Sequence, residues 1–351
     1  MNVGGSQEFI INYCREIPEF DITIMSIFGD NAYENVLHQL PNVRIVHLCN
    51  AKGTNRKKLM LFVPYAILRF AISTRHCLEQ YDWINPRLPF AALLCWLFGI
   101  SKHRNCHFNI DCDARQLTFY EKAVFKMCLP SFGSLSIARS LRGGFSFLSV
   151  DQRTIKHDPF FVTVRDSIDP IVYTEGTHLL FIARLVPQKG ATEAIAIMRE
   201  LERNSPGLFF LHIIGDGPER ANIESTCKSF NLQNVVLHGY QGNLGDWIVN
   251  CHGVLKTAVG EPSNSVVREA LLAGKRVYST IEADSDISMV ERGLVIPLER
   301  GQAFRSAQRI IATYRMDVEN PEQAREFTRT ARAEFSNTGV RDYYLNLTNE
   351  T

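Results

Sequence analysis

The chain has 351 residues, of which 45% are hydrophobic, and its 38 basic and 37 acidic residues nearly cancel. This length and composition suit two domains, each with its own core. The balanced charge, without a long basic run, excludes nucleic acid as an expected partner. The longest apolar run, residues 90–100, is shorter than the roughly 20 residues that a membrane-spanning helix needs.

Strand and helix patterns alternate through the first half of the chain. Residues 21–27 and 42–48 are rich in aliphatic side chains and predict strands, with a helix at 32–40 between them. A helix at 118–129 and a strand at 145–150 follow. This alternation is typical of a Rossmann-like domain with a parallel sheet.

Residues 56–70 are basic at the start and apolar afterwards, which allows two interpretations. A helix of this kind could lie on an anionic lipid surface. It could also be a core helix with a solvated start. We favour the core helix, because an apolar stripe usually marks packing against the protein interior.

A second segment, residues 101–113, concentrates potential metal ligands: His103, Cys106, His107, Asp111, Cys112 and Asp113. Their spacing fits no zinc pattern. The Asp-x-Asp triplet is weak support for a metal, because another such triplet occurs at 284–286. We therefore predict no metal site.

The stretch from 178 to 297 carries the chemistry. An apolar strand beginning near residue 179 is followed by Arg184 and Lys189, before a helix that starts near Thr192. Two cations beside a helix N-terminus suit a diphosphate, because the free N–H groups add to the side-chain charge. Strands at 208–214 and 234–238 follow, and helices are expected later in the chain at 302–315 and 321–335.

Two carboxylates stand eight residues apart, Glu261 in a loop and Glu269 inside the helix that this loop opens. Ser263 or Asn264 can cap the helix, and Gly274 can end it. Side chains in a helix lean toward its N-terminus. We therefore expect both carboxylates to face one cleft.

Three motifs follow one another in this stretch: RLVPQKG at 184–190, GDGPER at 215–220, and a Glu-x7-Glu pair leading into ALLAGK at 270–275. In this order they resemble the nucleotide-sugar domain of GT-B glycosyltransferases of family 4, the retaining type. The resemblance implies an α/β fold with two Rossmann-like, doubly wound parallel-sheet domains that face a cleft. We expect an acceptor-side domain at 1–172, a nucleotide-sugar domain at 173–335, and a helix at 336–351 that packs back on the first domain.

The resemblance also implies roles for individual residues. The donor diphosphate is expected at Gly5, Arg184, Lys189, Ser265 and Val266. The ribose and base are expected at Gly215, Tyr240 and Glu269, with Tyr240 either a wall for the base or a core aromatic. Glu261 would orient the donor sugar. In the family a histidine often follows a strand at this place and faces the acceptor side of the cleft. His107 is the candidate, with Asp111 second, and a structural histidine is the alternative.

Gly4-Gly5-Ser6 resembles the glycine turn that follows the first strand of GT-B enzymes. No strand stands before it, so we expect the N-terminal domain to lack its first strand. The start could be internal to a longer reading frame, or the gene could be a truncated copy. The first residues show no secretory signal, which predicts a cytoplasmic protein.

The expected reaction is transfer of a sugar, with retention, from a UDP- or GDP-linked donor to a glycan or lipid-linked acceptor, without metal or other cofactor. The resemblance implies bacterial surface polysaccharide or lipopolysaccharide synthesis, at the inner face of the cytoplasmic membrane. A sugar-nucleotide epimerase of the same fold is one alternative. A non-catalytic binding protein is another, since residues 261–265 depart from the family's usual Glu-Gly-Phe-Gly-Leu. An NAD-linked oxidoreductase is disfavoured, because Gly215-Asp-Gly217 lacks the third glycine.

Overall fold

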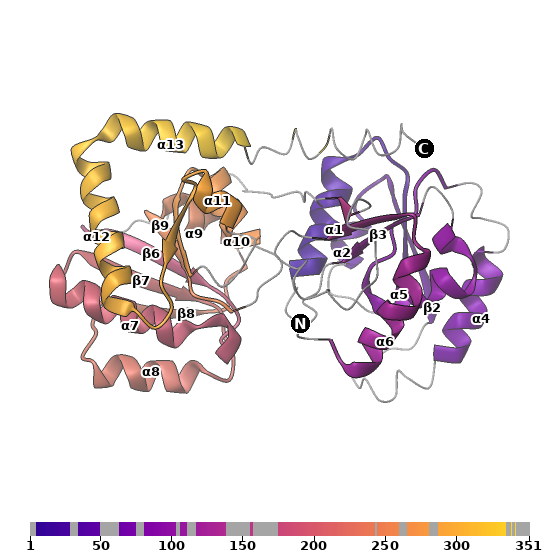
Figure 1. The fold of residues 1–351 in the computed structure, drawn as a ribbon, viewed down its shortest axis with the longest axis horizontal. Helices are drawn as coiled ribbons and strands as arrows, with labels where there is room; N and C mark the ends of the chain where they lie inside the picture. Colours follow the sequence, from indigo (N-terminus) through magenta and orange to yellow (C-terminus); the bar gives the residue numbers. More distant parts are fainter. Residues whose placement is uncertain are drawn as a thin grey trace. The chain divides into compact units, whose positions relative to one another are not determined.

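A computed structural model describes the following residues: 5–28, 34–49, 63–74, 81–102, 106–110, 117–137, 155–156, 175–242, 244–259, 265–280, 287–334, 338 and 341. The chain forms two compact units. The first comprises Met1–Phe161 with Asn337–Thr351, and the second comprises Val162–Ser336. Figure 1 shows the helices and strands of each unit.

The first unit alternates helices with parallel strands. Its elements are α1 (Gly5–Glu16), β1 (Ile22–Phe28), α2 (Glu34–Leu37), β2 (Val43–Cys49), α4 (Val63–Thr74), α5 (Leu88–Leu97), η3 (Ile100–Lys102), β3 (His107–Ile110), α6 (Phe119–Cys128), η4 (Leu129–Ser131), β4 (Ser134–Ile137) and β5 (Ile155–Lys156). Strand β1 pairs with β2, and β3, β4 and β5 form a three-stranded sheet. Helices α1 and α2 pack on β1 and β2 through Ile11, Cys14 and Leu37.

Most of the predicted elements in this unit are confirmed. The strands expected at 21–27 and 42–48 are β1 and β2, and the helix expected at 118–129 is α6. Helix α6 begins where predicted because Thr118 and Glu121 form a capping box, each side chain accepting a backbone N–H of the other. The strand expected at 145–150 lies outside the described residues.

Helix α4 has two apolar faces. Phe70 is buried and Ile67 packs beside it in the core, as the core-helix interpretation predicts. On another side of the helix, however, Tyr65, Leu68 and Ile72 are between 50% and 63% exposed. Burial of one stripe therefore does not account for all the apolar residues of this helix.

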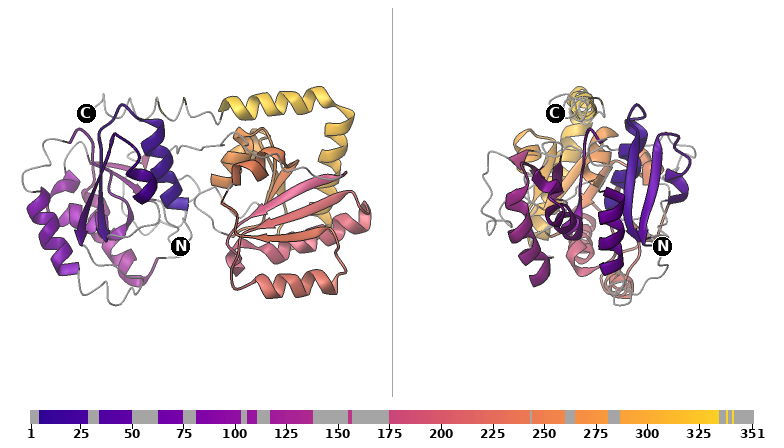
Figure 2. Two further views of the ribbon diagram at one scale, coloured as in Figure 1. Left: turned by 180° about the vertical axis from the view of Figure 1, so that it is seen from behind. Right: turned by 90° about the vertical axis from the view of Figure 1, so that its right-hand side faces the viewer.

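The second unit is one six-stranded sheet with helices on both faces (Figure 2). Its elements are β6 (Thr177–Ile182), η7 (Pro187–Lys189), α7 (Ala191–Asn204), β7 (Phe209–Ile214), α8 (Arg220–Ser229), β8 (Val235–Gly239), α9 (Leu244–Asn250), β9 (Gly253–Lys256), α10 (Ser265–Leu272), β10 (Arg276–Thr280), α11 (Ile287–Glu291), β11 (Val295–Leu298), α12 (Ala303–Glu319) and α13 (Pro321–Glu334). All neighbouring strands are parallel, in the order β11-β10-β9-β6-β7-β8. The chain thus winds outward from β6 in one direction and from β9 in the other, which is the doubly wound arrangement that was predicted.

Strand alternation divides the core of this unit into two layers. Leu179, Phe181 and Leu255 pack against α7, α8 and α12 on one face. Leu180 and Val254 pack against α9, α10, α11 and α13 on the other. The helices expected at 302–315 and 321–335 are α12 and α13.

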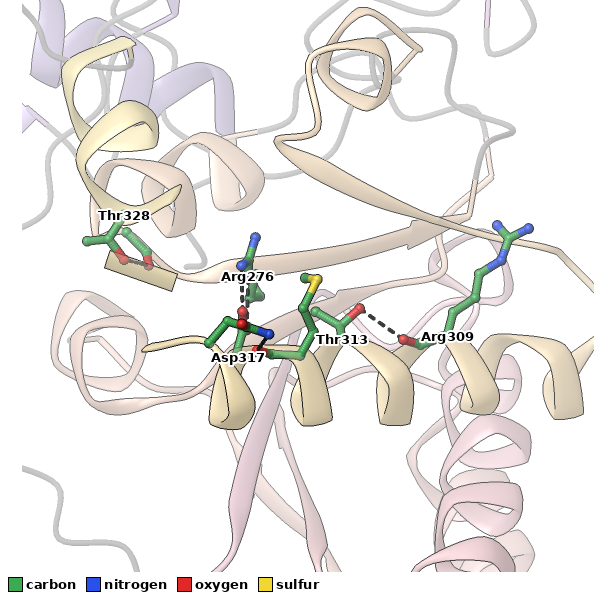
Figure 3. A network of polar contacts seen from close by, with 8 residues as sticks. Arg276, Arg309, Thr313, Asp317 and Thr328 are labelled. Carbon is green, nitrogen blue, oxygen red and sulfur yellow. Dashed lines mark hydrogen bonds and ion pairs between the residues drawn. The ribbon is translucent and has the colours of Figure 1, made fainter. Parts of the chain in front are cut away.

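A polar network holds α12 and α13 to the start of strand β10 (Figure 3). Arg276 of β10 donates two hydrogen bonds to Asp317 of α12, at 2.6 and 3.0 Å. The guanidinium also lies over the ring of Phe327 in α13, 3.7 Å from its centroid. One arginine therefore ties a strand to two helices through a bidentate ion pair and a cation–π contact.

Near the C-terminus, Arg341 donates hydrogen bonds to the side chain of Glu19 and to the backbone carbonyl of Glu16. Both partners follow or end α1, so this residue packs within the first unit. Among the described residues, no helix is both long and apolar enough to cross a membrane.

Candidate functional site

The direction of winding reverses between β6 and β9, which are neighbours in the sheet. In open α/β sheets, ligands bind beyond the C-terminal ends of the strands at this switch point. The segments that leave β6 and β9 there are η7, with the start of α7, and the loop after Lys256. These two segments are joined by hydrogen bonds.

Two hydrogen bonds, one from a backbone N–H and one from a side-chain hydroxyl, hold η7 against the loop after β9. Val259 N–H donates to the carbonyl of Gln188 over 2.8 Å, and Thr257 Oγ1 donates to the carbonyl of Gly190 over 2.7 Å. Gly190 has φ +72°, and a Cβ added there would lie 2.1 Å from the backbone oxygen of Thr257. Only glycine allows this approach, so Gly190 determines where Lys189 lies.

The Gly-Asp-Gly turn after β7 packs against the end of β6 in a similar way. A Cβ added at Gly215 would lie 1.9 Å from the carbonyl oxygen of Ala183, and one added at Gly217 would lie 2.4 Å from that of Leu185. Leu185 N–H also donates to the carbonyl of Asp216. The predicted Gly215 is therefore close to the segment that carries Arg184.

Positive charge collects at these strand ends. Arg184 is exposed, Lys189 is half-buried, and Lys256 ends β9. The pKa of Lys189 is lowered to about 8, first by burial and then by the positive charges of Lys256 and Arg184. Cations that repel one another in a partly desolvated place are stabilised when an anion binds between them.

Helix α10 covers the switch point from the other face. It begins at Ser265, and Val267, Ala270 and Leu271 bury its apolar side, as the sequence predicts. Its end at Gly274, with φ +74°, is also confirmed. Glu269 lies in this helix and is half-buried. The N-terminus of α10, where the positive end of the helix dipole lies, is on the side of the C-terminal ends of the strands.

The second unit thus contains most of the predicted donor-site residues. Arg184, Lys189, Gly215, Ser265, Val266 and Glu269 all belong to segments around the C-terminal ends of β6, β7 and β9. Tyr240 directly follows β8 and is 57% exposed, so it is not a core aromatic. Glu261, Ser263, Asn264 and Asp111 lie outside the described residues.

Two predicted residues belong to the first unit. Gly5 is the first residue of α1. His107 was expected to follow a strand, and this is wrong, because His107 opens β3. It is buried, stacks on Trp83 at 6.2 Å between ring centroids, and its carbonyl accepts a hydrogen bond from Asn85. These contacts favour the structural alternative over a role on the acceptor side.

A row of four histidines crosses the face of the sheet that α9 and α10 cover, and no sequence pattern predicted it. His178 Nδ1 lies 2.9 Å from His212 Nε2, and His212 Nδ1 lies 2.9 Å from His238 Nε2. His252 joins the row at its other end, where its Nδ1 accepts the backbone N–H of His178. Trp247 covers His238, with ring centroids 4.4 Å apart.

This row should make folding stability depend on pH. The pKa of His212 is lowered to about 4, mainly by burial and further by positive charge on His238 and His178. The unfolded state, with a histidine pKa near 6.5, binds more protons between those values, so stability is lost as pH falls. We expect His212 alone to remove about 2 kcal/mol of unfolding free energy between pH 7 and pH 5.

Urea denaturation at both pH values measures this loss. His212→Gln, which keeps a donor and an acceptor, should lose less stability on acidification than the wild type. His38→Gln, at an exposed position, should lose as much as the wild type. Equal losses in all three proteins would contradict a contribution from the row.

Known proteins resemble this chain in part of its sequence and in its fold. Residues 168–283 match the sequence profile of the family "Glycosyl transferases group 1". This range contains η7, the glycine turn after β7, and α10. No curated protein sequence matches the chain.

Solved structures resemble nearly the whole chain. The UDP complex of Anabaena Alr3699/HepE superposes with a TM-score of 0.76 at 16% identity, covering 99% of this chain and 97% of that one. Sucrose-phosphate synthase from Thermosynechococcus elongatus gives 0.75 at 15% identity, covering 99% and 95%. WaaG, a glycosyltransferase involved in lipopolysaccharide biosynthesis, gives 0.63 at 13%, covering 95% and 92%. The chain therefore has the GT-B fold, and residues 168–283 of its second unit match the profile of glycosyl transferases group 1.

Proposed function

We propose that the chain is a retaining, metal-independent glycosyltransferase of family 4, which moves a sugar from a UDP- or GDP-linked donor to a glycan or lipid-linked acceptor. The observation that carries the proposal is the group of cations at the switch point of the second unit. It lies within the range matched by the family profile. Further support comes from the similar structure of HepE, which is a complex with UDP.

In this proposal, negative charge grows on the departing diphosphate while the anomeric carbon becomes positive. The leaving group is stabilised by Arg184, Lys189 and the N-termini of α7 and α10. Their positive charge replaces that of a metal ion. The leaving phosphate accepts the proton of the acceptor hydroxyl. Glu269 accepts two hydrogen bonds from the ribose, and Glu261 orients the sugar. His107 is left out because it is buried against Trp83.

The reaction is tested with radiolabelled UDP- and GDP-sugars and a panel of glycan acceptors, in the presence of EDTA. Sugar transfer that keeps the anomeric configuration, read by NMR of the product, would support the proposal. Turnover of the donor without any acceptor would favour the epimerase instead. Inversion of the configuration, or activity that EDTA abolishes, would contradict the stated mechanism.

We further propose a role in surface polysaccharide or lipopolysaccharide synthesis at the inner face of the cytoplasmic membrane. The similarity to WaaG supports the pathway. The exposed apolar side chains of α4 support the membrane contact, because Tyr65, Leu68 and Ile72 are at least half exposed and Arg69 between them is exposed too. Such a face suits an anionic bilayer surface.

A pelleting assay with vesicles tests the membrane contact. The wild type should pellet with vesicles that contain phosphatidylserine, and the double variant Leu68→Ser/Ile72→Ser should remain in the supernatant. Leu97→Ser, at another exposed leucine in α5 (49% exposed), serves as the control and should pellet normally. Equal pelleting of all three proteins would refute a role for α4.

A further inference from the structure

Lys256 is a cation at the end of an otherwise buried strand. The other three residues of β9, Gly253, Val254 and Leu255, are buried, whereas Lys256 is half-buried. Val254 belongs to the core layer under α10, and Leu255 belongs to the opposite layer. Because side chains alternate along a strand, Lys256 projects on the α10 side.

The strand register places Lys256 at the switch point. Leu180 of β6 is level with Val254 of β9. Ile182 and Lys256 each follow by two residues and are the last residues of their strands. Arg184 follows Ile182 by two residues. Lys256 and Arg184 thus extend from adjacent strand ends on the two sides of the point where the winding reverses.

Lys256 is also tied to the segment of Lys189. The next residue, Thr257, donates a hydrogen bond to Gly190, which follows Lys189 directly. The positive charges of Lys256 and Arg184 both lower the pKa of Lys189. Three cations, the half-buried Lys189 and Lys256 and the exposed Arg184, therefore lie close together at this end of the sheet.

From this arrangement we infer that Lys256 is a third phosphate-binding residue of the donor site, which contacts the nucleoside diphosphate together with Arg184 and Lys189. The inference rests on the proposed function of the same site. It explains why a lysine ends β9 on the side that α10 covers. An anion that binds between neighbouring positive charges is attracted by each of them.

Isothermal titration calorimetry tests the inference on the whole chain. UDP and GDP, each with its monophosphate and its nucleoside, are titrated into the wild type and into Lys256→Met, Lys256→Arg and Lys189→Met. We expect Lys256→Met to lower the affinity for the diphosphate by a factor of at least about ten, which is the size expected for one lost charge-assisted contact. The nucleoside should bind this variant as it binds the wild type, and Lys256→Arg should restore most of the diphosphate affinity.

The melting temperature without nucleotide separates binding from folding. A residue that serves binding and not folding can be replaced without loss of stability, so Lys256→Met should melt no lower than the wild type. If this variant melts lower, or if it binds diphosphate and nucleoside with equally reduced affinity, Lys256 serves the fold and the inference is overturned. If Lys256→Met binds the diphosphate as tightly as the wild type while Lys189→Met binds it more weakly, the inference on Lys256 is overturned but the proposed function stands. Failure of the wild type to bind any of the nucleotides would overturn the proposed function and the inference with it.

Discussion

Gly190→Ala should destabilise the second unit by about 4 kcal/mol, enough to unfold a marginal domain. Alanine in the left-handed region costs about 1 kcal/mol or more by itself. The larger part comes from the new Cβ, which would lie 2.1 Å from the carbonyl oxygen of Thr257 and force the two segments apart. Urea denaturation measures the loss, and nucleotide titration should show weakened binding because Lys189 is displaced.

Gly207→Ala is the matched control for this substitution. Gly207 has φ +69°, close to the +72° of Gly190, but a Cβ added there meets nothing within 4 Å. Gly207→Ala should lower the free energy of unfolding only by the roughly 1 kcal/mol that alanine costs at positive φ, and it should leave nucleotide affinity unchanged. If both variants lose the same stability, the close approach of Gly190 to Thr257 does not limit folding.

Lys189→Met should weaken nucleoside diphosphate binding about 100-fold, which corresponds to about 3 kcal/mol for a partly buried, charge-assisted phosphate contact. The lysine is half-buried and close to two other cations, so the bound anion replaces repulsion with attraction. Calorimetry with UDP and GDP measures the affinity. Lys228→Met, at an exposed site in α8, is the control and should bind as the wild type does.

The same lysine gives the binding reaction a pH signature. With a pKa of about 8 it is about half neutral at pH 8, and a bound diphosphate favours its charged form. Binding at that pH should therefore take up about half a proton, and affinity should fall as pH rises above 8. Calorimetry in two buffers of different ionisation enthalpy measures the uptake. Lys189→Met should show none, and uptake in this variant equal to the wild type would assign the proton to another group.

The elements of the second unit were largely predictable because their patterns are long and local. Strand 208–214 and the helices at 302–315 and 321–335 are each determined by their own periodicity. Strand β9 is different. It has four residues and ends in a lysine, so it has neither the length nor the alternation by which a strand is recognised.

The residues that the sequence did not reveal depend on contacts between distant segments. Lys256 becomes part of the cationic cluster only through the register of β9 with β6. Gly190 could be read as the start of a helix, but its approach to Thr257 spans 67 residues of sequence. The histidine row likewise forms only because the sheet aligns three strands, one histidine on each. His107 was misplaced for a related reason, since a short strand such as β3 has no clear start in the sequence.

The central claim is that the switch point of the second unit binds a nucleoside diphosphate without a metal. Thermal unfolding of the purified chain with UDP, GDP and ADP, each with EDTA, tests it most directly. A ligand at 100 times its dissociation constant adds about 2.7 kcal/mol of stability, which raises the melting temperature by several degrees. The account predicts that at least one of these nucleotides gives this rise with the wild type and not with Lys189→Met. No rise with any of them, or the same rise in both proteins, would contradict it.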